Sequence, residues 1–165
     1  MALYVRKISR AKWPEDVSEF NNIAELKSDA LADLRTQNNT LSFWKIESES
    51  DLESAILALS ASSSTSKIEN ITIIWTEEET LKSKGFIIDE SVPGDTVVQD
   101  LKNTHRDLCE LTYASLGTVA EIIIQSLKSD KFKRYSKNKV RQLLVQAYEN
   151  NRVSETSLIV EELKK

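Results

Sequence analysis

A strand, a helix and a second strand follow one another within residues 41–75, and this succession constrains the fold more than any other feature of the chain. Residues 41–46 and 71–75 are short runs rich in β-branched and aromatic side chains, which is typical of strands. Between them, a capping box and a set of apolar residues at helical spacing indicate a helix, namely Ser50 with Glu53, then Leu52, Ala55, Ile56 and Leu59. Two strands joined through one helix form a βαβ unit, in which the strands are parallel and the crossover is right-handed.

Two more strands are expected before residue 93. Residues 3–8 favour a strand, and residues 86–89 favour a short edge strand. Three consecutive acids, residues 77–79, open a short helix that ends near Gly85; they could bind a cation, but complementing a helix dipole is the simpler interpretation. We therefore expect an α/β-like part over residues 1–92, with a sheet of three or four strands.

The pattern changes at Pro93-Gly94. An apolar seam at helical spacing runs from Val97 to Leu127 through His105, and further amphipathic segments follow at 140–148 and 154–163. These segments predict a helical part of three or four helices over residues 95–165, packed beside the sheet, so the expected class is α+β. A chain of 165 residues is long enough for one core, and we expect both parts to unfold as one cooperative unit.

The rare residues exclude several kinds of site. The chain contains three Gly, one His and one Cys. Three scattered glycines leave no phosphate-binding loop or dinucleotide fingerprint, and one His with one Cys cannot supply the four ligands of a Cys/His zinc site. We therefore expect no cofactor, no metal and no internal disulfide. Because no catalytic motif is recognisable, the composition favours a non-catalytic protein.

The N-terminus and the single cysteine bear on the compartment. Charges at Arg6 and Lys7 arrive before the apolar core of a signal peptide could form, and no run approaches 18 apolar residues. A lone Cys109 fits a reducing environment. We therefore expect a cytoplasmic protein that makes no contact with a membrane.

The net charge of −4 conceals a segregated distribution. Residues 1–14 carry four cations and no acid, while residues 128–141 carry seven cations and one acid. An acidic body with two basic segments can steer and orient a partner of complementary charge. The first expected function is therefore an interaction or regulatory module that binds another protein, with its oligomeric state left open. Trp13, in a loop beside basic residues, is the candidate partner contact.

The segment 128–141 also supports an alternative function, binding of RNA or DNA. Its cations could contact phosphates, and Phe132 and Tyr135 could stack on unpaired bases. The acidic total charge argues against this alternative. The candidate contacts for a nucleic acid or another anion come from both basic segments: Arg6, Arg10, Lys133, Arg134, Lys137 and Arg141.

A third hypothesis is an enzyme or small-molecule sensor centred on His105 and Cys109. If residues 97–127 form a helix, these two residues are one turn apart on the same face, as a catalytic Cys–His pair requires. The alternative is that both are packing residues, because free cysteines are usually buried. No neighbouring acid is placed to orient the imidazole, so His105 and Cys109 are weak catalytic candidates.

Overall fold

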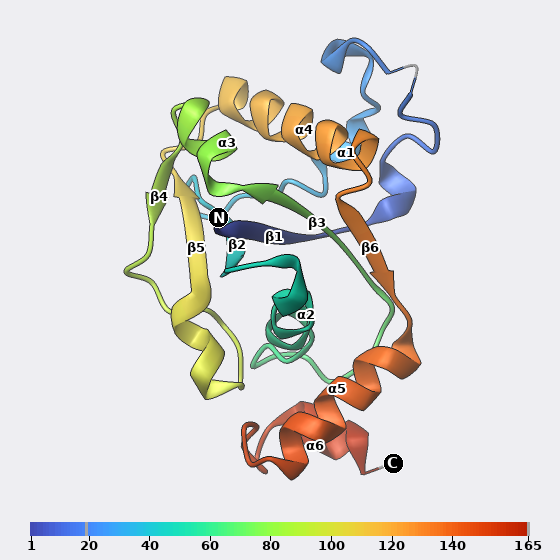
Figure 1. Ribbon diagram of the computed structural model, residues 1–165, viewed down its shortest axis with the longest axis vertical. Helices are drawn as coiled ribbons and strands as arrows, with labels where there is room; N and C mark the ends of the chain where they lie inside the picture. Colours follow the sequence, from blue (N-terminus) through green and yellow to red (C-terminus); the bar gives the residue numbers. More distant parts are fainter. Residues whose placement is uncertain (19, 165) are drawn as a thin grey trace.

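A computed structural model describes residues 1–18 and 20–164 and contains one six-stranded sheet with helices on both faces (Figure 1). Its strand order is β4-β5-β2-β1-β3-β6, and every neighbouring pair is antiparallel. The expected α+β class is confirmed, but the sheet is larger than the three or four strands predicted. The strands are β1 (Leu3–Ile8), β2 (Leu41–Ile46), β3 (Ile71–Glu77), β4 (Ile87–Asp89), β5 (His105–Cys109) and β6 (Phe132–Tyr135).

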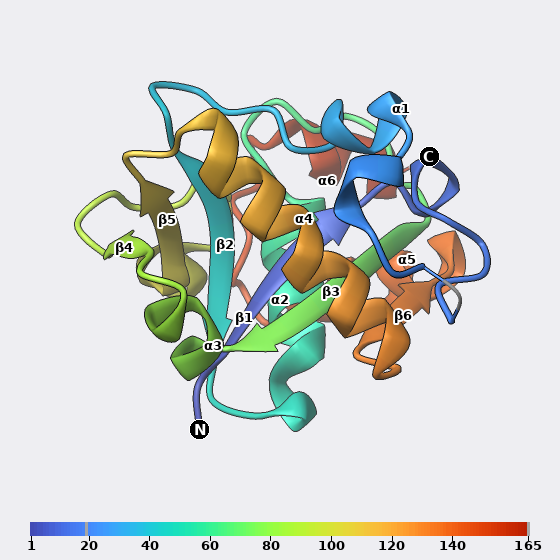
Figure 2. The same cartoon turned by 90° about the horizontal axis from the view of Figure 1, so that it is seen from above.

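Helices cover both faces of the sheet. On one face lie α2 (Leu52–Ser60), α5 (Lys137–Glu149) and α6 (Leu158–Leu163), which share a core with Val5, Trp44 and Trp75. On the other face lie α1 (Ser28–Leu31), α3 (Glu78–Ser83) and the longest helix, α4 (Tyr113–Lys128), which crosses the sheet in Figure 2. Short 3₁₀ helices complete the chain: η1 (Arg10–Lys12), η2 (Ile23–Glu25), η3 (Glu49–Asp51) and η4 (Gln99–Thr104).

The strand–helix–strand unit is present, but its two strands are not neighbours. β1 lies between β2 and β3 and is antiparallel to both, so that Val5 pairs with Trp44 on one side and with Trp75 on the other. The expected adjacent parallel pair is therefore wrong. The apolar start of β1 explains the insertion, because Leu3, Tyr4 and Val5 are all buried and a strand covered on both faces suits a central position.

The prediction of a purely helical segment after Pro93-Gly94 is also wrong. Residues 105–109 form β5, and residues 132–135 form β6, so this segment contributes two strands to the sheet. The apolar seam breaks at Glu110, which has a left-handed φ of 54°, and α4 begins only after a capping box between Thr112 and Ser115. From there α4 continues without a break through Gly117.

The described residues contain neither a helix that could span a membrane nor a cluster of metal ligands. Within residues 1–18 and 20–164, every helix is too short or too polar to serve as a membrane span. In the same part of the chain, no three His, Cys, Asp or Glu side chains gather closely enough to hold a metal ion.

Candidate functional site

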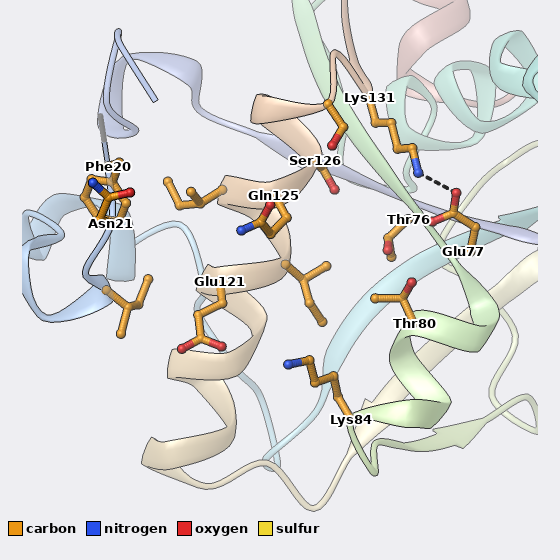
Figure 3. A pocket seen from close by; sticks show the side chains of 14 residues that line it. Phe20, Asn21, Thr76, Glu77, Thr80, Lys84, Glu121, Gln125, Ser126 and Lys131 are labelled. Atoms are coloured by element: carbon orange, nitrogen blue, oxygen red, sulfur yellow. Dashed lines mark hydrogen bonds and ion pairs between the residues drawn. The ribbon is translucent and has the colours of Figure 1, made fainter. Parts of the chain in front are cut away.

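A polar cavity of about 360 Å³ opens between the end of β3, α3, α4 and the loop that contains residues 20–23 (Figure 3). Cavities of this size are typical of sites for small ligands. The wall formed by β3 and α3 carries Thr76, Thr80 and Lys84, and Figure 3 shows Glu121 and Gln125 across from them on α4. The rest of the lining is Phe20, Asn21, Ile23, Glu77, Ile122, Ile124, Ser126, Ser129 and Lys131.

Three features position these side chains: the direct connection of β3 to α3, the helical spacing on α4, and a hydrogen bond between α4 and β3. α3 begins at Glu78, directly after β3 ends, so residues of both elements share one wall. On α4, Glu121, Gln125 and Ser129 recur every four residues and therefore share one face. The Ser126 hydroxyl donates to the carbonyl of Trp75 over 3.0 Å, which fixes α4 against β3.

The four charged groups of the cavity divide into a pair and two single charges. Lys131 donates to Glu77, and this hydrogen bond lowers the pKa of the Glu77 carboxyl below its usual value. Within residues 1–18 and 20–164, Lys84 and Glu121 have no partner within ion-pair distance. The cavity therefore presents one free ammonium and one free carboxylate.

Thr76 and Ser126 are buried polar residues of the cavity, and Ser126 is hydrogen-bonded to the carbonyl of Trp75. Thr76 is 3 % exposed, and its hydroxyl makes no hydrogen bond with any residue that the structure describes. The hydroxyl of Thr80 and the amide of Gln125 are likewise without partners in the described chain. The Thr76 hydroxyl is not among the atoms that the protein encloses completely, so it reaches the cavity. This wall therefore offers hydrogen bonds that a ligand or water can satisfy.

His105 and Cys109 are not the adjacent pair that a helix would have produced. Both lie on β5, where a spacing of four residues separates them by roughly 13 Å along the strand. The His105 ring is 7 % exposed and is held by two contacts, Nδ1 at 3.0 Å from the carbonyl oxygen of Val92 and Nε2 at 3.5 Å from Oδ1 of Asp107. The imidazole is thus packed between elements of the fold.

Cys109 also lacks the environment of a nucleophile. Burial raises the pKa of its thiol, and the carboxylates of Asp89 and Asp107 raise it further. A reactive cysteine needs the opposite, a neighbouring cation that favours the thiolate. Its sulfur lies 3.6 Å from the carbonyl oxygen of Asp107.

The two arginines near the N-terminus, Arg6 and Arg10, hold the fold together. Arg6 donates to the carbonyls of Ser42 and Asp33, and burial lowers the pKa of its guanidinium to about 10. Arg10 donates to three carbonyls of the following loop, those of Trp13, Pro14 and Glu15.

Trp13 is not the exposed aromatic that its loop position predicted. It is 2 % exposed, and its indole N–H donates to Oδ2 of Asp33 over 2.9 Å. The expectation failed because the loop folds back over α4 and encloses the ring in the core on that face.

The basic residues of 128–141 divide between surface and structure. Lys133, Arg134 and Lys137 are exposed, and Lys133 lies over the ring of Tyr135 at 5.2 Å. Arg141 instead donates to the carbonyl of Leu163 over 2.9 Å and ties α5 to α6.

The fold brings the two basic segments together beside the unpaired edge of β6. Arg10 shares a surface hollow with Lys128 and Phe132. Lys7 and Lys133 pair with the same residue of β3, Ile73, from its two sides. Figures 1 and 2 show the chain after β1 on the same side of the molecule as β6. We call this surface the basic corner and define it by Lys7, Arg10, Lys67, Lys128, Lys133, Arg134 and Lys137.

Sequence reasoning found the cations of this corner but none of the free polar residues of the cavity. The cavity residues come from three separate stretches, and only the four-residue spacing of Glu121, Gln125 and Ser129 was visible in the sequence. Comparison with known proteins assigns neither surface: no protein-family model, no curated protein and no solved structure matches this chain.

Proposed function

We propose that this protein is a non-catalytic interaction module that binds an acidic segment of another protein at the basic corner. One observation carries the proposal: cations that are more than 100 residues apart in sequence gather at one edge of the sheet without acidic partners. Within residues 1–18 and 20–164, no carboxylate lies within ion-pair distance of any of these seven cations.

The basic corner contrasts with the acidic charge of the rest of the molecule. The chain has 26 acids against 22 Lys and Arg, so a surface with unpaired cations stands out on an acidic body. A positive patch of this kind accelerates association with an acidic partner and orients it. The effect falls with ionic strength, because exposed charges are screened over about 10 Å at 0.1 M salt.

The edge strand adds a second means of recognition. The sheet ends at β6, and no described residue outside β3 hydrogen-bonds to the backbone of residues 132–135. An extended segment of a partner could add to this edge through main-chain hydrogen bonds, while its acidic side chains meet Lys133 and Arg134. Those same charges discourage pairing with a second copy of the edge.

A protein partner fits the basic corner better than a nucleic acid does. The aromatic rings that could stack on bases are largely covered, since Tyr135 is 3 % exposed and Phe132 is half-buried and packs against the core beneath α4. Glu15, Asp16 and Asp130 line the same hollow as Arg10, so this part of the corner carries both signs of charge. A surface of mixed charge matches a protein segment, which can present both signs.

The test compares two triple variants in affinity capture from a lysate of the native host at low salt. Lys133→Glu/Arg134→Glu/Lys137→Glu reverses the corner, and Lys27→Glu/Arg35→Glu/Lys102→Glu reverses three unpaired cations elsewhere. We expect a stoichiometric protein partner with wild type and with the second variant, and its loss with the first. Capture of the same partner by all three proteins, or of none, would refute the proposal.

Nucleic acids are tested in parallel. Single-stranded RNA and duplex DNA are titrated at about 50 mM salt, where phosphate contacts are strongest. Tight binding that the first triple variant abolishes, together with no protein partner, would replace the proposed function with nucleic-acid binding.

A further inference from the structure

We propose that the cavity between β3, α3 and α4 binds a small zwitterion of the α-amino acid class, with its ammonium at Glu121 and its carboxylate at Lys84. This site is separate from the basic corner and is not part of the interaction function proposed above. The proposal rests on the charges, the hydroxyl and amide groups without described partners, and the fixed walls of the cavity.

The charges specify a ligand that is neutral overall but carries both signs. Glu77 and Lys131 neutralise each other, which leaves one carboxylate and one ammonium without partners in the described chain. These two groups project from different walls, Lys84 from the end of α3 and Glu121 from α4 (Figure 3). A ligand with a single charge would satisfy one of them and leave the other unpaired.

The neutral part of the lining suits the rest of an amino acid. Thr76, Thr80 and Gln125 supply hydroxyl and amide groups that no described residue occupies. Phe20 and Ile23 lie on the loop side of the cavity and provide apolar contact for a ligand side chain. A volume of about 360 Å³ holds a molecule of this size together with a few waters.

The walls are fixed before any ligand arrives. The amide of Lys131 donates to the carbonyl of Ser126 over 2.8 Å, and the amide of Trp75 donates to the carbonyl of Lys131 over 3.1 Å. On the loop side, the ammonium of Lys128 donates to the carbonyl of Phe20 over 2.7 Å. A preformed site loses little conformational entropy on binding, which favours affinity for a small ligand.

The experiment uses the full chain and follows its amide resonances by NMR while each of the twenty protein amino acids is added at millimolar concentration. We expect at least one of them to shift the resonances of Thr76, Thr80 and Gln125. Glu121→Gln and Lys84→Met should each weaken its affinity about tenfold or more, because each removes a charge-assisted hydrogen bond. Glu149→Gln and Lys102→Met, which change exposed or half-exposed residues outside the cavity, should leave the affinity unchanged.

Ligands with one charge or none provide the decisive comparison. Ethanolamine, glycolate and glucose should bind at least tenfold more weakly than the best amino acid. Equal binding by any of them, or no shift of the cavity resonances with any amino acid, would overturn the proposal. The Lys133→Glu/Arg134→Glu/Lys137→Glu variant should bind the amino acid normally, so failure of this inference and failure of the interaction function can be distinguished.

Discussion

Replacement of Gly94 by alanine should destabilise the protein because a side chain at this position has no room. A Cβ atom built there lies 2.3 Å from Cη2 of Trp44, 2.8 Å from Cζ3 of the same ring and 2.8 Å from Cβ of His105. Trp44 cannot easily move aside, since it is 5 % exposed and packs edge-on against the His105 ring, with 5.4 Å between the ring centroids.

The size of the effect follows from two opposing contributions. Adding a methyl group to a filled core costs about 1–3 kcal/mol, and a contact of 2.3 Å with an aromatic ring falls at the upper end. Alanine also restricts the unfolded chain, which returns about 0.4–1 kcal/mol. Gly94→Ala should therefore lower the free energy of unfolding by about 2 kcal/mol. For a domain of this size, the melting temperature should fall by about 4–8 °C.

Urea denaturation followed by circular dichroism measures this loss, and two variants make the measurement specific. Gly117→Ala is the matched control, because a Cβ there meets nothing within 4 Å and the helix interior should gain about 0.5–1 kcal/mol. Trp44→Phe shortens the obstructing ring, so Gly94→Ala should cost less in that background. If Gly94→Ala is neutral, or stabilises the protein as Gly117→Ala does, the steric argument is refuted.

Four further outcomes are expected. Cys109 should react with iodoacetamide at pH 7 more slowly than an unstructured cysteine peptide, since burial and nearby carboxylates raise its pKa; an equal or faster rate contradicts this. Lys131 lowers the pKa of Glu77, so this pair stabilises the fold above about pH 4.5, and its contribution is lost at lower pH. Glu77→Gln should therefore reduce the loss of unfolding free energy at acid pH. The reduction should be less than about 1 kcal/mol, because both side chains are about one-third exposed. Trp13→Phe removes the hydrogen bond to Asp33 and should cost about 1–3 kcal/mol in urea denaturation, whereas an unchanged midpoint would count against it. Calorimetry should show one unfolding transition, and two separated transitions would rule out a single cooperative unit.

The apolar strands near the N-terminus were predictable from local pattern. The expected strands at 3–8 and 41–46 coincide with β1 and β2, and the strand at 71–75 lies within β3. Each has buried residues that β-propensity favours. The capping box was expected at Ser50 and Glu53 but forms two residues earlier, between Ser48 and Asp51, because the chain first makes the 3₁₀ turn of η3.

β5 could not be predicted because its local sequence contradicts its environment. It buries three consecutive polar residues, His105, Arg106 and Asp107, which no strand pattern favours. Their partners come from distant segments: Glu90 lies 3.0 Å from Arg106, and Ser42 donates to Asp107. The sequence carries no local signal of those contacts, so the apolar spacing of residues 97–127 was interpreted as a helix.

The candidate site was predictable only in part, for the same reason. The unpaired cations of the basic corner were visible as clusters in the sequence, whereas their meeting at one edge depends on the strand order. The cavity depends on tertiary packing altogether, since Thr76 and Glu121 are brought together only when α4 packs against β3.

The central position of β1 has a consequence for the order in which the chain can fold. β1 has no partner until residues 41–46 and 71–77 have been synthesised, because Leu3 pairs with Ile46 and with Glu77. Only β4 and β5 pair over a short stretch of chain, from Ile87 to Cys109. A sheet built from such distant pairings closes long loops before its contacts form, which places refolding in the range of milliseconds to seconds. During synthesis, the apolar residues of β1 therefore remain exposed until nearly half of the chain has emerged, and this interval is when the protein is most exposed to aggregation.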